Sequence, residues 1–195
     1  MKKYYLICAA LAVFMLMTVG FVRMERQSGE DLYGAIIAGL GDDEQFALLD
    51  FGEGQQVLLT TDSTYDDGNG NSVAINCNVC IRIDGKAYYA FGSIESMGTA
   101  YPVSYDKGRL YTASGHDVTV YTFDMVNRQW VTAQYEEVFD ENGTASYFCI
   151  TTGTASNQNI GMRAKEAISE EDFLAVMEEY GEAEVVSFGY GASQS

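Results

Sequence analysis

Ser114, His116 and Asp117 bring the three side-chain types of a hydrolytic triad into four consecutive positions. In a triad the serine attacks, the histidine acts as the base, and the carboxylate orients the histidine. Triad members normally come from separate elements, and the chain has no Gly-x-Ser-x-Gly turn to present a nucleophilic serine. We therefore interpret Ser114-Gly115-His116-Asp117 as a turn between strands, and we assign no catalytic residue.

Cys77 and Cys80 have the spacing of zinc and redox motifs, and Cys149 with His116 would complete four zinc ligands. Residues three positions apart on a strand point to opposite faces, which disfavours both chelation and a bond between Cys77 and Cys80. Buried thiols are the simplest interpretation. A disulfide from Cys149 to one of them is the alternative in an exported domain.

A polar loop from Asp62 to Asn71 carries the oxygen ligands that calcium prefers. Its Asp67-x-Asn69-x-Asn71 spacing copies three EF-hand positions, but Ser72 replaces the glycine and Asn78 the bidentate glutamate. Turn formation explains the same residues. We expect neither a metal site nor a cofactor.

Adjacent acids at Glu136-Glu137 and Asp140-Glu141 suggest glycoside hydrolysis, which requires two carboxyl groups roughly 5–10 Å apart across a cleft. Adjacent acids near a turn are usually solvated instead. A cell-surface carbohydrate-active hydrolase is therefore the alternative function, not the leading one.

These residues lie on a predicted antiparallel meander from Val73 to Thr151. Its first strand alternates apolar and polar residues up to Ile83, which indicates one buried and one exposed face. Strands are expected before and after it, at Phe46–Leu49, Val57–Leu59, Arg109–Ala113, Val118–Asp124, Gln129–Phe139 and Thr144–Thr151.

The turn at Asp84-Gly85 allows two registers. A two-residue loop places Ile83 opposite Lys86, whereas a three-residue loop with a bulge pairs Ile81 with Ala87 and keeps one face apolar. We predict the three-residue loop, with the pairs Ile81–Ala87, Val79–Tyr89 and Cys77–Phe91.

Capping-box sequences at Ser28 and Ser169 predict two helices. The first is short and ends near Gly41, and the second covers residues 169–180 with Gly181 as its terminator. Val185–Phe188 would add a last strand. The predicted fold is mainly β (α+β), a blade-like or partly rolled antiparallel meander with a short N-terminal helix and a C-terminal helix.

Residues Tyr33 to Thr61 and Ile168 to Tyr180 resemble a group of exported proteins from Gram-positive gut bacteria. That group has a D-x-D-G-D-G-x-x-E-L loop, which stands here as Asp50-Phe51-Gly52-Glu53-Gly54-Gln55-Gln56-Val57-Leu58. Related FG-GAP and EF-hand-like loops hold calcium with carboxylates that this loop lacks. Gly108 to Trp130 also looks like one blade of a kelch-type propeller. Neither resemblance implies a reaction.

The uncharged run from Tyr4 to Val22 is 19 residues long, or roughly 28 Å of helix, enough to cross a bilayer. Lys2 and Lys3 before it favour a cytoplasmic N-terminus. We predict an uncleaved anchor over residues 1–26 and an extracytoplasmic domain over residues 27–195. Cleavage after Gly20 is the alternative, and Cys8 lacks the context of a lipoprotein signal.

Charge limits the partners of the outer segment. From Gln27 onward the chain keeps 7 of its 11 basic residues and 27 of its 28 acids, so its formal charge is −20. Such a charge repels nucleic acid and anionic lipid. We expect a non-catalytic, membrane-anchored extracytoplasmic binding or interaction domain of unknown ligand, with a protein or a carbohydrate as the candidate partners.

The anchor gives a first testable prediction. The full chain should fractionate with membranes, and protease added to intact cells should digest the part after Val22, because that run is long and apolar enough to stay in the bilayer. Immunoblotting of the fractions measures both results. A soluble secreted form beginning at Phe21 would contradict the anchor and establish cleavage.

Overall fold

The structure is a computed structural model, and it describes residues 33–52, 54–83, 86–155 and 163–190. One compact unit begins at Leu40, and residues 33–39 belong to another unit, in which residues 33–37 are helical. The described part is mainly antiparallel β-structure, as predicted. None of the described helices is long and apolar enough to cross a membrane. The predicted anchor at residues 4–22 and the predicted domain boundary between residues 26 and 27 lie outside the described residues.

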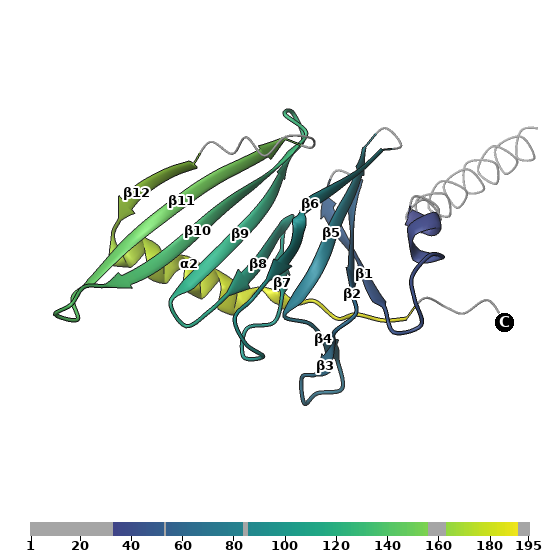
Figure 1. Ribbon diagram of the computed structural model, residues 1–195, viewed down its shortest axis with the longest axis horizontal. Helices are drawn as coiled ribbons and strands as arrows, with labels where there is room; N and C mark the ends of the chain where they lie inside the picture. The colour runs from purple at the N-terminus through teal and green to yellow at the C-terminus, as the bar shows by residue number, and fades with distance from the viewer. Residues whose placement is uncertain (1–32, 53, 84–85, 156–162, 191–195) are drawn as a thin grey trace, which may run out of the picture. The chain divides into compact units, whose positions relative to one another are not determined.

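Two antiparallel sheets and a small hairpin make up the larger unit (Figure 1). The first sheet has the order β1-β2-β5-β6 and consists of Gln45–Gly52, Gln55–Thr61, Asn76–Ile83 and Lys86–Glu95. The second has the order β12-β11-β10-β9-β8-β7-β13 and consists of Arg163–Ile168, Ala145–Ala155, Gln129–Phe139, Asp117–Asp124, Arg109–Ala113, Ser104–Asp106 and Glu184–Val185. The hairpin pairs β3 (Tyr65–Asp66) with β4 (Ser72–Val73).

The predicted strands at Arg109–Ala113 and Gln129–Phe139 are confirmed at both ends. The prediction of a single strand from Val73 to Ile83 is wrong, because β4 ends at Val73 and β5 begins at Asn76. The carbonyls of Ala74 and Ile75 turn away to accept hydrogen bonds from other segments, at 2.9 and 2.7 Å. Within β5 the predicted apolar row at Cys77, Val79, Ile81 and Ile83 does face the core.

The predicted register of the next hairpin is also wrong. Ile83 pairs with Lys86 and Ile81 with Tyr88, the register of a two-residue loop. The pairing shifts between Asn78 and Cys80, after which Cys77 pairs with Ile94. This irregularity lets Cys77 and Ile94 both pack in the same core. A bulge at the turn is therefore not required to keep these two side chains on the buried face.

β12 lies between the predicted strand that ends at Thr151 and the predicted helix that begins at Ser169, where no strand was predicted. Its residues are mostly charged or alanine and have low strand propensity. The strand forms as the edge of the large sheet, paired to β11 alone, where charged side chains discourage further pairing.

Helix α2 (Glu170–Glu182) covers one face of the large sheet and begins with the predicted capping box. The Ser169 hydroxyl accepts from the Asp172 N–H, and the Asp172 carboxylate accepts from the Ser169 N–H, at 3.1 and 3.2 Å. Phe173 is buried, and the helix packs on a cluster of four buried residues. Val176, Met177 and Tyr180 contact this cluster, which consists of Tyr111, Ala113, Val118 and Val120.

Gly181 does not end the helix as predicted. It is not among the glycines with positive φ, and the helix continues to an extended cap at Ala183, whose N–H reaches Glu179 and Tyr180. The chain then enters β13, which pairs with β7. Pairing with the sheet therefore determines where α2 stops.

Both sheets contribute side chains to one hydrophobic core. Val57, Leu59 and Val79 of the small sheet pack with Leu110 and Trp130 of the large one. A close backbone approach brings the β7–β8 turn against the end of β1. A Cβ on Gly108 would lie 3.0 Å from the Phe51 carbonyl oxygen.

Gly108 allows a matched test of this approach. Gly108 and Gly143 both have φ of 79°, but a Cβ on Gly143 would meet nothing within 4 Å. Each alanine variant should lose about 1–3 kcal/mol of stability from left-handed strain alone. Gly108→Ala should lose more, because it also pushes β1 away. Urea denaturation measures both, and equal losses would show that the approach to Phe51 is not tight.

Candidate functional site

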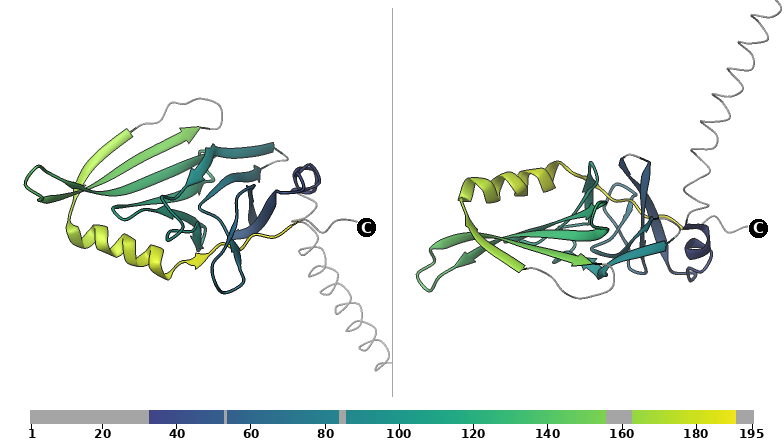
Figure 2. Two further views of the ribbon diagram at one scale, coloured as in Figure 1. Left: turned by 60° about the horizontal axis from the view of Figure 1, so that its bottom comes forward. Right: turned by 90° about the horizontal axis from the view of Figure 1, so that it is seen from above.

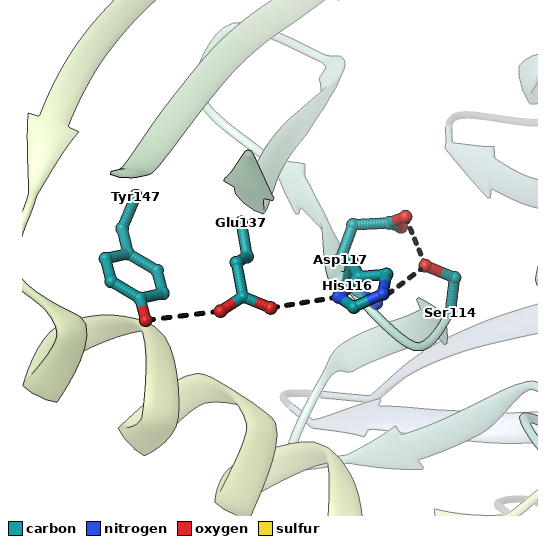
Figure 3. Close-up of polar contacts among 5 residues, drawn as sticks. All are labelled: Ser114, His116, Asp117, Glu137 and Tyr147. Atoms are coloured by element: carbon teal, nitrogen blue, oxygen red, sulfur yellow. Dashed lines mark hydrogen bonds and ion pairs between the residues drawn. The ribbon is translucent and has the colours of Figure 1, made fainter. Parts of the chain in front are cut away.

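A chain of polar contacts links the β8–β9 turn to β10 and β11 (Figure 3). The Ser114 N–H donates to the Asp117 carbonyl at 2.8 Å, which closes the turn. The Ser114 hydroxyl donates to the Asp117 carboxylate and accepts from the His116 N–H. The predicted turn is therefore confirmed, and its serine hydroxyl is engaged within the turn.

The His116 ring points to a different partner. Its Nδ1 lies 2.9 Å from Glu137 Oε2, and Glu137 Oε1 accepts the Tyr147 hydroxyl at 3.2 Å. The His116 side chain is 65% exposed and that of Glu137 is 19% exposed. Partial desolvation, followed by the hydrogen bond to Glu137, raises the pKa of Tyr147, so the phenol remains the donor.

This arrangement differs from a triad in one decisive contact. In a triad the imidazole takes the proton of the serine hydroxyl, whereas here that hydroxyl bonds to a carboxylate and the ring bonds to Glu137. The contacts can fix the positions of the turn and of β10. They supply no activated nucleophile.

The cysteines lie in separate surroundings. Cys77 belongs to the shared core, and Cys80 is buried outside that cluster, in agreement with the predicted opposite faces. Burial raises the pKa of the Cys77 thiol to about 12, which keeps it protonated and unreactive. Cys149 is half-buried on β11, and within the described chain none of the three forms a disulfide.

The candidate metal residues are used in turns. Asp67 accepts from the N–H groups of Asn69 and Asn71 at 2.8 and 3.1 Å, and from the Asn71 amide at 2.9 Å. Asp50 accepts from the Gly52 N–H at 2.8 Å, and Glu53 lies outside the described residues. In the described ranges no three His, Cys, Asp or Glu side chains converge as metal ligands would.

The adjacent acids do not form a catalytic pair. Glu136 bonds to Lys165 at 2.6 Å on one face of the sheet, and Glu137 bonds to His116 on the other. The carboxylate of Asp140 accepts from the N–H groups of Asn142 and Thr144 and so holds the β10–β11 turn. Glu141 is exposed in the same turn.

Strand alternation separates the large sheet into two surfaces. Tyr147 contacts Phe173 of α2, with ring centroids 5.3 Å apart, so its neighbour Phe148 faces away from the helix. Figure 2 shows α2 along one side of β10 and β11 only. We call the other side the open face. It is made by Thr132, Gln134, Glu136, Phe148, Thr152, Lys165 and Ala167, with Ile150 buried among them.

Side chains on the open face hold one another in place. Lys165 Nζ lies 4.0 Å from the centre of the Phe148 ring and also bonds to Glu136, while Thr132 donates to the Thr152 carbonyl. The sequence could not indicate this face, because it depends on β12. The sequence does show the alternation of side chains along β10 and β11. This alternation predicts that the sheet has two faces, but it does not predict which face a helix covers.

No family model, curated protein or solved structure matches the chain. The resemblance to exported bacterial proteins therefore stays a prediction.

Asp67 predicts a pH dependence. Its hydrogen bonds from Asn71 and Asn69 lower its pKa from 3.8 to about 2. Because the folded-state pKa lies below the unfolded one, this carboxylate stabilises the fold above about pH 4, and the stabilisation is lost as pH falls through about 2.

The Asp67→Asn variant should therefore be less stable than the parent at pH 7, with a difference that shrinks towards pH 2. Urea melts across that range measure it. Asp43→Asn, at an exposed carboxylate in the linker before β1, is the control. A difference that persists unchanged at pH 2 would show that the charge of Asp67 is not its source.

Proposed function

We propose that the chain is a non-catalytic, membrane-anchored binding module outside the cytoplasm, and that its open face binds a neutral carbohydrate. Residues 4–22 supply the anchor in this proposal. In the same proposal the two sheets form a partly rolled sheet around their shared core, and β10–β12 extend beyond it to present the face.

The observation that carries the proposal is the composition of the open face. An aromatic ring, Phe148, lies among the amide and hydroxyl groups of Gln134, Thr132 and Thr152 on a regularly paired sheet. Sugars have apolar C–H faces that stack on aromatic rings and hydroxyl groups that bond to such polar side chains. Ordered side chains also reduce the entropy lost on binding.

Charge supports a neutral ligand. Among the residues named for the open face, the two charged ones, Glu136 and Lys165, pair with each other. On the opposite side, α2 exposes six acids and has no basic residue in its last turn. These acids are Glu170, Glu171, Asp172, Glu178, Glu179 and Glu182. The acidic domain repels an anionic ligand, whereas a neutral ligand that approaches the open face is not repelled.

The hydrolase alternative has less support. Its best pair of acids, Glu136 and Glu137, lies on opposite faces of the sheet, so the two cannot flank one glycosidic bond. Binding without hydrolysis fits the open face better.

The proposal is tested by applying the full chain, in nonionic detergent, to an array of neutral oligosaccharides. A retained sugar should bind about tenfold more weakly to Phe148→Ala, the loss expected when a central contact worth roughly 1.4 kcal/mol is removed. Phe148→Tyr should keep binding. Glu166→Gln is the control, because Glu166 follows Lys165 on the other side of β12.

Melting curves of each variant separate loss of binding from unfolding. If no sugar is retained, or if Phe148→Ala binds as the parent does, the carbohydrate proposal fails. Release of the sugar as shortened products would favour the hydrolase instead.

A further inference from the structure

A pocket of about 410 Å³ lies where the small sheet meets the segment after α2. Its walls are β1 from Phe46 to Asp50, the segment Glu184–Ser187, and Tyr105 of β7. This volume lies within the range of small-molecule sites, and the pocket is remote in sequence from the strands of the open face. We call it the seam pocket.

Two contacts flank the stretch of β1 that lines the seam pocket. At one end Phe46 and Gly189 exchange two backbone hydrogen bonds, of 2.8 and 3.0 Å. At the other, the Phe51 ring stacks on Tyr105 with centroids 5.5 Å apart. Between them, among the described residues, no backbone hydrogen bond joins β1 to Val185 or Ser187. The two segments therefore diverge and leave an opening instead of forming a ladder.

The lining combines three kinds of groups. Leu48, Leu49, Val185 and Val186 are aliphatic, Tyr105 is aromatic, and Asp50 and Glu184 are acidic, and the described residues of the wall include no lysine, arginine or histidine. Burial raises the pKa of Tyr105, and the negative charges of Asp50, Asp106 and Glu184 raise it further. The phenol and these carboxylates thus lie close enough to influence one another.

The cations on the neighbouring β7–β8 hairpin pair with acids that do not line the seam pocket. Lys107 and Arg109 lie 3.4 and 3.8 Å from Asp106, and Arg109 also bonds to Glu179. Asp50 and Glu184 therefore face the seam pocket without a basic residue in its described wall. An ammonium group would supply the missing charge, bond to the carboxylates and lie against the Tyr105 ring.

Other ligand classes fit less well. Calcium requires six to eight oxygens, more than two carboxylates and a phenol supply. An anion would meet two like charges, and an uncharged apolar molecule would desolvate both carboxylates without compensation. The aliphatic wall favours a cation that carries a hydrocarbon chain.

We propose that the seam pocket binds a primary ammonium group on an aliphatic chain, as found in a lysine side chain or a free alkyl diamine. This site is separate from the open face and does not depend on carbohydrate binding. The two carboxylates hold the ammonium group, and Tyr105 with the aliphatic wall contacts the chain that bears it.

The test is titration calorimetry on the full chain in nonionic detergent at fixed ionic strength. The probes are Nα-acetyl-lysine N-methylamide for the side-chain source and 1,5-diaminopentane for the free amine. Nα-acetyl-norleucine N-methylamide has the same aliphatic chain without the charge. We expect saturable binding of at least one charged probe and none of the neutral one.

Asp50→Asn and Glu184→Gln should each weaken that binding about tenfold, because each removes a charge-assisted hydrogen bond. The side-chain amide introduced by Asp50→Asn can still accept from the Gly52 N–H, and melting curves check that both variants fold. Glu171→Gln, on the outer surface of α2, should bind as the parent does. A Kd unchanged in both pocket variants, equal binding of the neutral probe, or no saturable binding by either amine would overturn the proposal.

Discussion

The residues after α2 hold the two sheets together. Val186 donates to the Val103 carbonyl, Phe188 to the Ser72 carbonyl, and Gly189 exchanges hydrogen bonds with Phe46. The side chains of Val186 and Phe188 are buried in the shared core. A single extended segment, yellow in Figure 1, thus passes from the large sheet to the small one and satisfies backbone groups on both. Without it, the apolar faces of two separate sheets would be incompletely covered.

Arg109 has a similar role on a smaller scale. Its guanidinium lies over the Tyr111 ring at 5.5 Å and bonds to Glu179 of α2 at 2.8 Å. The last turn of α2 has acids and no basic residue, an arrangement that opposes the helix dipole. Arg109 offsets part of this cost from the sheet, so one cation of a strongly acidic domain both neutralises and fixes the helix.

Local signals in the sequence predicted much of this fold. Alternation located β8 and β10, and the spacing of Ser169 and Asp172 predicted the start of α2, because each signal involves residues close in the chain. The failures concern partners that are distant in sequence. The break before Asn76 depends on bonds to Val103 and Ser96, the end of α2 depends on β13, and β12 is a strand because β11 lies beside it.

The candidate sites also divide into features set by residues close in the chain, which were predictable, and features set by distant residues, which were not. The turn at Ser114–Asp117 was predictable, because its hydrogen bonds lie within four residues. The link from His116 to Glu137 and Tyr147 was not, since it requires the register of three strands. Neither the open face nor the seam pocket could be inferred, because each combines segments whose proximity only the folded chain establishes.

The bridge between Phe46 and Gly189 also bears on how the chain folds. These residues are 143 positions apart, and Val186 and Phe188 of the core lie beside one of them. The ribosome synthesises the core residues of β1 and β2 long before those that complete the core. Contacts of such sequence separation form slowly, because a long loop must close first. The emerging chain would therefore remain incompletely folded until residues 186–189 have been made and can pack on β1 and β2.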